Sequence, residues 1–292
     1  MRTFAALCLT IVLSVAHAAR DDQFADVAVK AIPVGGSVYM LTGAGGNAAV
    51  SIGKDGTLLV DDQYAALAPR IQSAITQLGG TAPKLIVNTH FDPDHTGGNV
   101  FFAERAVIIA AEQVRYRLLN DPATARAALP VVTFADRIRL QFNNDEIDVI
   151  HFPNGHTDGD SVVWFRAANV LHTGGLFPNS GFPYIDFDNG GSVQGYLDAV
   201  AQMLDMVPAD TRIIPGHGPL ASVVELGEFQ DMLKATVSNI RARIAAGESV
   251  DAIVAAGLGP QWASYATGAI NEERWIRTVQ GSATPVEGGR RR

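Results

Sequence analysis

The chain has 292 residues, of which 47% are hydrophobic, so it can bury the core of a large single domain. Acidic residues outnumber basic residues by 30 to 22, and the resulting formal net charge of −8 argues against nucleic acid as a partner. The single cysteine, Cys8, excludes an internal disulfide bond.

The first 18 residues have the composition of a secretory signal peptide. Arg2 supplies a positive charge, an apolar run covers residues 4–15, and Ala16-His17-Ala18 provides small residues before a cleavage site. This run is too short to span a bilayer, and no later run is long enough. We therefore expect an exported protein, secreted and periplasmic in a host with an outer membrane. Removal of Cys8 would leave a mature chain without a thiolate ligand or a cysteine nucleophile.

Strands and helices alternate along the rest of the chain. Apolar runs bounded by turn residues predict strands at 38–41, 48–52, 58–60, 85–87, 107–109, 138–140, 147–152, 162–165, 170–171 and 213–214. Helices are predicted over 67–78, from Ser192 onward, over 223–245 and after Asn271. No linker divides the chain, so we expect one domain over residues 19–280 and a disordered tail over 281–292.

Four potential metal ligands lie within six residues directly after the run 85–87: His90, Asp92, Asp94 and His95. Imidazole and carboxylate together suit zinc or iron. A polar turn that caps a helix is the alternative explanation. Four ligand types in six positions favour a metal site over that turn.

Two later histidines lie in glycine-flanked turns, each just after an apolar strand. They are His156, in Gly155-His156-Thr157, and His217, in Gly216-His217-Gly218. Glycine allows the backbone to turn tightly and leaves the imidazole unobstructed. Either histidine alone would be read as a loop residue, but together with the first motif they predict metal ligation.

These motifs, in this order, resemble those of the metallo-β-lactamase superfamily over about residues 31–220. The resemblance implies an α/β fold, namely an αββα sandwich of two mixed β-sheets flanked by helices, with a metal site formed by loops at one edge. It assigns His90, Asp92 and His156 to one metal site, and Asp94, His95 and His217 to the other. The expected cofactor is Zn²⁺, one or two per chain, with iron or manganese as alternatives.

The chain departs from the family pattern at two positions. Asp92 replaces the second histidine of the first motif, and Gly175 follows His172-Thr173-Gly174 where many members carry a bridging aspartate. We hypothesise that Asp92 offsets the charge of the missing bridge and that water fills the vacancy. A harder ligand at Asp92 should also weaken the preference for zinc relative to iron or manganese.

Several further polar residues are candidates for supporting roles. Asp61 and Asp62 either orient a ligand imidazole or simply form a polar strand end. His151 and His172 are expected to be hydrogen-bonded structural residues. The resemblance places Tyr184 and Asn179 in a loop beside the substrate pocket, which makes them candidate substrate contacts.

The resemblance implies an exported metal-dependent hydrolase. A metal-bound hydroxide would cleave an ester, a lactone, a thioester or a cyclic amide such as a β-lactam, and Asp94 would ligate and orient this nucleophile. The exported, cysteine-free chain is most similar to the β-lactamase subclass without a cysteine ligand, and its expected partner is a small-molecule substrate. Two alternatives remain: an iron-binding redox enzyme of the same fold, and a non-catalytic metal-binding relative.

Overall fold

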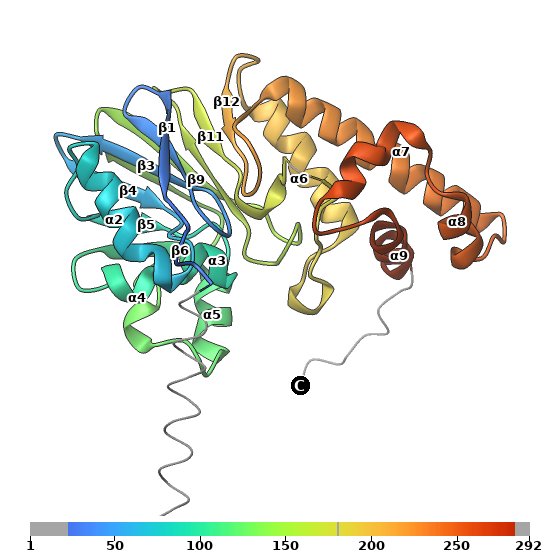
Figure 1. Ribbon diagram of the computed structural model, residues 1–292, viewed down its shortest axis with the longest axis horizontal. Coiled ribbons are helices and arrows are strands. Elements are labelled where there is room, and N and C mark those ends of the chain that lie inside the picture. The colour runs from blue at the N-terminus through green and yellow to red at the C-terminus, as the bar shows by residue number, and fades with distance from the viewer. Residues whose placement is uncertain (1–22, 180, 284–292) are drawn as a thin grey trace, which may run out of the picture.

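The structure is a computed structural model that describes residues 23–179 and 181–283. The predicted signal peptide, residues 1–18, lies outside the described residues. Two mixed β-sheets pack face to face, with helices on both outer faces (Figure 1). This arrangement confirms the predicted αββα sandwich. Within the described ranges, no helix is both long and apolar enough to cross a membrane.

The first sheet has seven strands in the order β1-β2-β3-β4-β5-β6-β7. Their bounds are β1 Lys30–Gly35, β2 Val38–Thr42, β3 Ala48–Gly53, β4 Gly56–Val60, β5 Leu85–Val87, β6 Val107–Ala111 and β7 Val132–Phe134. Strands β1 to β4 pair antiparallel, whereas β4 to β7 pair parallel. The parallel strands therefore end at the same edge of the sheet.

The second sheet has six strands in the order β13-β12-β11-β10-β9-β8. Their bounds are β8 Arg137–Phe142, β9 Asp145–His151, β10 Ser161–Phe165, β11 Val170–His172, β12 Arg212–Ile214 and β13 Ala221–Ser222. Strands β8 to β11 pair antiparallel, and β11 pairs parallel with β12. As a result, β9, β11 and β12 all point in one direction.

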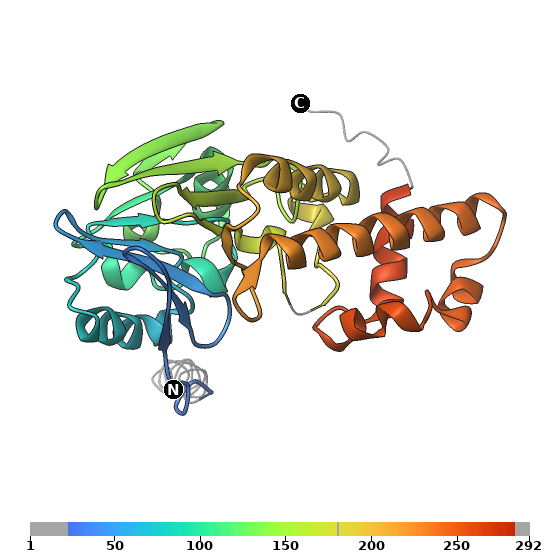
Figure 2. The same ribbon diagram turned by 90° about the horizontal axis from the view of Figure 1, so that it is seen from above.

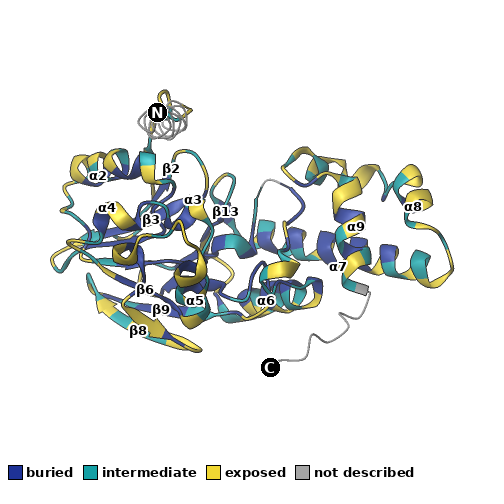
Figure 3. Ribbon diagram, turned by 90° about the horizontal axis from the view of Figure 1, so that it is seen from below, coloured by how far each residue is buried: buried dark blue, intermediate teal, exposed yellow. Residues whose placement is uncertain are grey.

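Apolar side chains fill three layers. The layer between the sheets includes Val60, Val87, Val149 and Ile214. The outer face of the first sheet is covered by α2 (Ala68–Gln77), which buries Ile71 and Ile75. The remaining elements beside this sheet are α3 Pro93–Thr96, α4 Asn99–Phe102, α5 Glu112–Asn120, η1 Ala65–Leu67 and η2 Arg126–Ala128. Exposed residues follow the outer sides of these helices and of β8 (Figure 3).

The outer face of the second sheet is covered by α6 (Val193–Met206) and α7 (Val223–Ala245). Both begin where the sequence predicts, because each has a side-chain cap. The Ser192 hydroxyl accepts a hydrogen bond from the Gly195 N–H at 2.9 Å, and the Glu225 carboxylate accepts one from the Ser222 N–H at 2.7 Å. The shorter elements between β11 and α6 are η3 Gly174–Leu176 and η4 Phe187–Asn189.

Helix α7 extends beyond the sheets and carries the C-terminal segment at its far end (Figure 2). This segment comprises α8 Val250–Ala256, η5 Pro260–Thr267 and α9 Glu272–Ala283. Trp275 of α9 is fully buried, and its indole N–H donates to the Thr236 hydroxyl of α7 at 3.0 Å. The C-terminal segment is therefore packed onto α7 through a hydrogen-bonded core residue.

Several short elements were not predicted from the sequence, among them β7, β13, α5 and α8, and two further differences have a clear physical reason. Strand β1 was not predicted, because Pro33 interrupts its pattern; as the edge strand of its sheet, β1 tolerates a missing N–H. Residues 281–283 belong to α9, so the tail expected from residue 281 begins no earlier than residue 284. The buried residues Trp275, Ile276 and Val279 hold these last turns in place. Residues 284–292 lie outside the described part of the chain.

Candidate metal centre

The carboxyl ends of the strands that point in one direction bring the predicted ligands together. In the first sheet, Asp61 follows β4, and His90 to His95 follow β5. In the second sheet, His156 lies in the loop after β9, and His217 lies in the loop after β12. Because the sheets pack face to face, these loops meet at one edge of the sandwich.

The six predicted ligands form two adjoining groups. In the first group, the ligand atoms of His90, Asp92 and His156 all lie within 4.8 Å of one another. The second group consists of Asp94, His95 and His217 and meets the same distance limit. The Nε2 atoms of His95 and His217 are 3.4 Å apart across this group. These are imidazole and carboxylate donors in compact sets of three, which fits divalent metal ions such as zinc.

Asp61 holds two of the histidines in one tautomer. Its carboxylate accepts hydrogen bonds from the Thr89 N–H at 2.8 Å, from the Thr89 hydroxyl at 2.7 Å and from His95 Nδ1 at 2.7 Å. The Thr89 oxygen, having donated its proton to Asp61, accepts from His90 Nδ1 at 3.0 Å. Both rings therefore turn Nε2 toward the ligand groups.

His156 is oriented in the same way by a different acceptor. Its Nδ1–H donates to the backbone oxygen of Tyr184 at 3.0 Å, and its Nε2 lies 3.2 Å from Asp92 Oδ2. The buried Asp160 carboxylate accepts from both the backbone N–H and the hydroxyl of Thr157, which closes the loop that carries His156. This loop therefore turns Nε2 of His156 toward the first ligand group.

Charge and burial strongly shift the pKa values of three candidate ligands, His156, Asp92 and His217. Burial lowers the pKa of His156, but the hydrogen bond to Asp92 and the nearby carboxylates outweigh burial and raise it to about 9. Burial raises the pKa of Asp92, yet its hydrogen bonds to His156 and His90 bring it far below its ordinary value. Burial, together with repulsion from His95, lowers the pKa of His217 to about 4. The Asp92 carboxylate thus stays ionised and attracts positive charge into the site.

The loop that carries His217 is held by Asn47, a residue that the sequence analysis did not single out. The Asn47 side-chain amide donates to the backbone oxygens of Pro215 and Gly218, each at 2.9 Å, and its backbone N–H donates to the Gly216 oxygen at 2.7 Å. Asn47 follows Gly45-Gly46, where a Cβ at Gly46 would overlap the His95 ring. The sequence signal that could have pointed to Asn47 is the glycine pair directly before it, in the turn between two predicted strands.

Gly175, one of the two departures from the family pattern, is explained by close packing. A Cβ at this position would overlap the ring of His156. The Gly175 backbone oxygen accepts from the Tyr196 hydroxyl at 2.9 Å, which ties this turn to α6. Any side chain at Gly175 would displace His156, so the absence of a bridging carboxylate and the position of His156 are linked.

The supporting residues divide by what they contact. Asp61 orients imidazoles, whereas the Asp62 carboxylate accepts backbone N–H groups, that of Gly98 at 2.8 Å, and has no hydrogen bond to an imidazole among the described residues. Burial and the charge of Asp61 raise the pKa of Asp62 well above its usual range, which favours its neutral form.

The two remaining described histidines bind backbone groups. His172 donates from Nε2 to the Asn47 oxygen and accepts the Gly174 N–H at Nδ1. His151 contacts the backbone oxygens of Ala135 and Asp158.

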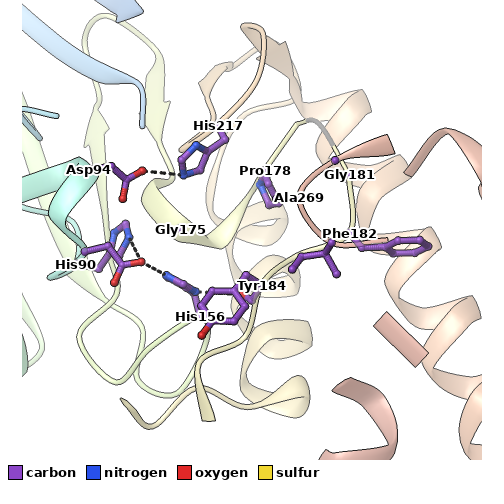
Figure 4. A pocket seen from close by; sticks show the side chains of 13 residues that line it. His90, Asp94, His156, Gly175, Pro178, Gly181, Phe182, Tyr184, His217 and Ala269 are labelled. Carbon is purple, nitrogen blue, oxygen red and sulfur yellow. Dashed lines mark hydrogen bonds and ion pairs between the residues drawn. The ribbon is translucent and has the colours of Figure 1, made fainter. Parts of the chain in front are cut away.

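The two candidate substrate contacts lie in different surroundings. A cavity of about 310 Å³ opens onto both ligand groups, and Tyr184 lines it (Figure 4). Asn179 is not among the described lining residues. Its side-chain amide instead donates to the Pro219 oxygen at 3.1 Å, and its N–H donates to the His217 oxygen at 2.8 Å. Asn179 therefore supports the His217 loop.

Arg117 of α5 is a further residue that carried no sequence signal. Its guanidinium contacts the Asp158 carboxylate through two nitrogens, the nearer at 2.6 Å, and donates to Asn189 Oδ1 at 2.8 Å. Asp158 lies two residues after His156, and Asn189 lies in η4. Arg117 thus joins α5 to the two loops that orient His156.

Comparison with known protein families matches the metallo-beta-lactamase superfamily over residues 41–217. The chain is 30% identical to a hydroxyacylglutathione hydrolase from Rhodospirillum rubrum over 154 residues, covering 52% of this chain and 54% of that protein. It is 23% identical to a type 2 metallo-beta-lactamase from Bacillus sp. strain 170, covering 51% of this chain and 57% of that protein. The chain thus spans about half the length of these curated relatives.

Solved structures share the fold. A metallo-beta-lactamase from Pontibacter korlensis superposes with a TM-score of 0.61 at 18% identity, covering 70% of this chain and 99% of that one. The DIM-1 metallo-beta-lactamase superposes with a TM-score of 0.60 at 18% identity, covering 72% of this chain and 99% of that one. More than a quarter of the present chain lies outside each superposition.

Substitution of Asp61 by Asn should lower metal affinity about 10- to 100-fold, because Thr89 and His95 lose the ionised acceptor that sets the imidazole tautomers. Competition with a chromophoric chelator measures this loss. Asp62→Asn is the matched control, since Asp62 favours its neutral form and has no hydrogen bond to an imidazole of the described chain. Equal affinities in both variants would show that Asp61 does not orient the ligands.

His172 should make the metal-free protein less stable in acid. Burial lowers its pKa from 6.5 to about 4 in the folded state. Between these values the unfolded chain binds more protons than the folded one, so the contribution of His172 is complete above pH 6.5 and is lost as pH falls toward 4. The loss is up to about 3 kcal/mol.

Urea unfolding with chelator present, from pH 7.5 to 4, tests this expectation. His172→Gln should give a flatter dependence of the unfolding free energy on pH than the wild type does. The comparison uses the slope, so a uniform loss of stability in the variant does not affect it. Parallel curves would rule out His172 as the titrating group.

Proposed function

Because this chain belongs to the metallo-β-lactamase superfamily, we propose that it is an exported metal-dependent hydrolase that cleaves an ester, thioester, lactone or cyclic amide bond in a small molecule. The observation that carries this proposal is the pair of adjoining ligand groups at the base of the cavity, with imidazoles already turned toward them. Export rests on the signal-like first 18 residues and on the lack of cysteine after Cys8.

The residues present fit two divalent ions. His90, Asp92 and His156 would hold one ion, and Asp94, His95 and His217 would hold the other. Such ions, when bound, lower the pKa of water toward neutrality and polarise a carbonyl oxygen. One relative is named as a hydroxyacylglutathione hydrolase and the other as a metallo-beta-lactamase, so a thioester and a β-lactam are the first substrates to test.

Asp94 is the residue that we assign to orienting the nucleophile. Its Oδ2 lies 3.7 Å from His95 Nε2 and 3.5 Å from His217 Nε2, and its side chain lines the cavity. A carboxylate in this place can hold a ligand group together and also accept a proton from an attacking water. It therefore contributes both to binding and to the reaction.

The first experiment combines metal analysis with a substrate screen. Mature protein, Ala19 to Arg292, exported in its host and purified without chelator, should contain about two divalent ions per chain by mass spectrometry and hydrolyse at least one of the four substrate classes. Asp94→Asn should lower kcat/KM by roughly 100-fold or more. Asp198→Asn, on the exposed side of α6, is the matched control and should retain full activity. A metal-loaded protein that is inactive on all four classes would favour the alternative that this chain is a non-catalytic metal-binding relative.

Asp92 gives a separate prediction about metal identity. A hard carboxylate in place of an imidazole shifts preference toward iron and manganese. Asp92→His should therefore raise the ratio of zinc affinity to manganese affinity by roughly tenfold or more, measured by competitive titration. Asp198→His serves as the control for an added histidine. An unchanged ratio would show that Asp92 does not set metal preference. Iron bound to the purified wild-type protein, together with an oxygen-dependent reaction, would favour the alternative of an iron-binding redox enzyme.

A further inference from the structure

The cavity has two chemically different ends (Figure 4). One end is polar and is formed by the candidate ligands. The other end is apolar and is lined by Pro178, Gly181, Phe182, Gly268, Ala269 and Ile270. Among the described lining residues, none with a charged side chain lies at this apolar end.

Half of the apolar end comes from the C-terminal segment, beyond the part of the chain that matches the superfamily. That match covers residues 41–217, whereas Gly268, Ala269 and Ile270 connect η5 to the last helix. The segment contacts the loop after η3 directly through the backbone, since the Phe182 N–H donates to the Tyr265 oxygen at 3.0 Å. A Cβ at Gly181 would lie only 2.8 Å from that same oxygen. The two walls of the apolar end are therefore in close contact.

Aromatic packing holds these walls in place. The ring of Phe182 stacks on Trp275 at 5.6 Å between centroids with an interplanar angle of 11°. Trp275 is in turn anchored to Thr236 of α7. The guanidinium of Arg274 lies 5.2 Å from the ring centroid of Tyr184, next to His156. The apolar end is thus formed before any ligand binds, which lowers the entropic cost of binding.

The chemistry of this end defines what it can accept. A charged group placed there would lose its water without gaining a partner, whereas each methylene group buried there gains affinity. We infer that residues 268–270 and Phe182 select substrates whose group remote from the reacting carbonyl is a short, uncharged hydrocarbon chain or ring. The reaction at the polar end of the cavity rests on the proposed function, whereas the apolar end is inferred from its lining residues alone.

Alkyl hydroxamic acids test this inference without turnover, because the hydroxamate binds the metals and the tail extends into the cavity. Calorimetry on the metal-loaded full chain would use acetohydroxamate, butyrohydroxamate, hexanohydroxamate and the charged succinic monohydroxamate. Affinity should rise by roughly fourfold per methylene group from acetyl toward butyryl. The succinic compound should bind at least about tenfold more weakly than the butyryl compound.

Ala269→Asp places a charge at the apolar end, at a position exposed enough to accept it without disturbing the fold. It should reduce the ratio of butyryl to acetyl affinity to about one. Ala252→Asp, on the exposed side of α8 in the same segment, is the matched control and should keep the wild-type ratio. Metal content is measured in both variants, so that a change in the ratio is not confused with metal loss.

The same series as p-nitrophenyl esters separates this inference from the proposed function. Tail-length dependence of hydroxamate binding in a protein that hydrolyses neither these esters nor any thioester, lactone or cyclic amide would support the apolar site and count against the hydrolase. Hydrolysis with no dependence on tail length, or an equal effect of the two variants, would overturn the apolar site. Preferred binding of the succinic compound would also overturn it.

Discussion

The candidate centre depends on one buried carboxylate, that of Asp61. It lies directly after β4 with a left-handed backbone conformation, φ of 58°, and accepts three hydrogen bonds from Thr89 and His95. Burial alone would raise its pKa, but the charge and hydrogen bond of His95 prevail and lower it. An ionised acceptor at this place sets the tautomers of His95 and, through Thr89, of His90. With Nδ1 of each ring hydrogen-bonded in this way, Nε2 of His90 faces the first ligand group and Nε2 of His95 faces the second.

The fold supplies the second constraint, which is close approach between loops from different sheets. Asn47 from the first sheet fastens the loop of His217 from the second, and Gly46 leaves space for His95. Gly175 does the same for His156. Where backbone and imidazole meet this closely, a side chain cannot be added without moving a ligand. The replacement of a bridging aspartate by glycine is thus a packing requirement of this chain.

The C-terminal segment adds a third element, on which substrate choice would depend. Packing of Trp275 against Phe182 and α7 brings residues far apart in sequence to the apolar end of the cavity. The polar end follows the superfamily motif, whereas half of the apolar end, residues 268–270, lies outside the matched region. The proposed specificity would therefore depend partly on a segment that contributes none of the six candidate ligands.

The sequence alone was sufficient to predict the fold class, most strands and the set of six candidate ligands. Strand and helix periodicity is local, and the first motif places four potential ligands within six residues, so both are visible in the sequence. The fold class and the grouping of the six ligands came from the resemblance of these motifs to the superfamily. Only the tertiary structure distinguished Asp61 from Asp62, placed Asn179 beside Pro219, revealed the roles of Asn47 and Arg117, and showed that Gly175 makes room for His156. Each of these depends on contacts between segments distant in sequence, and no local pattern encodes which of them will meet.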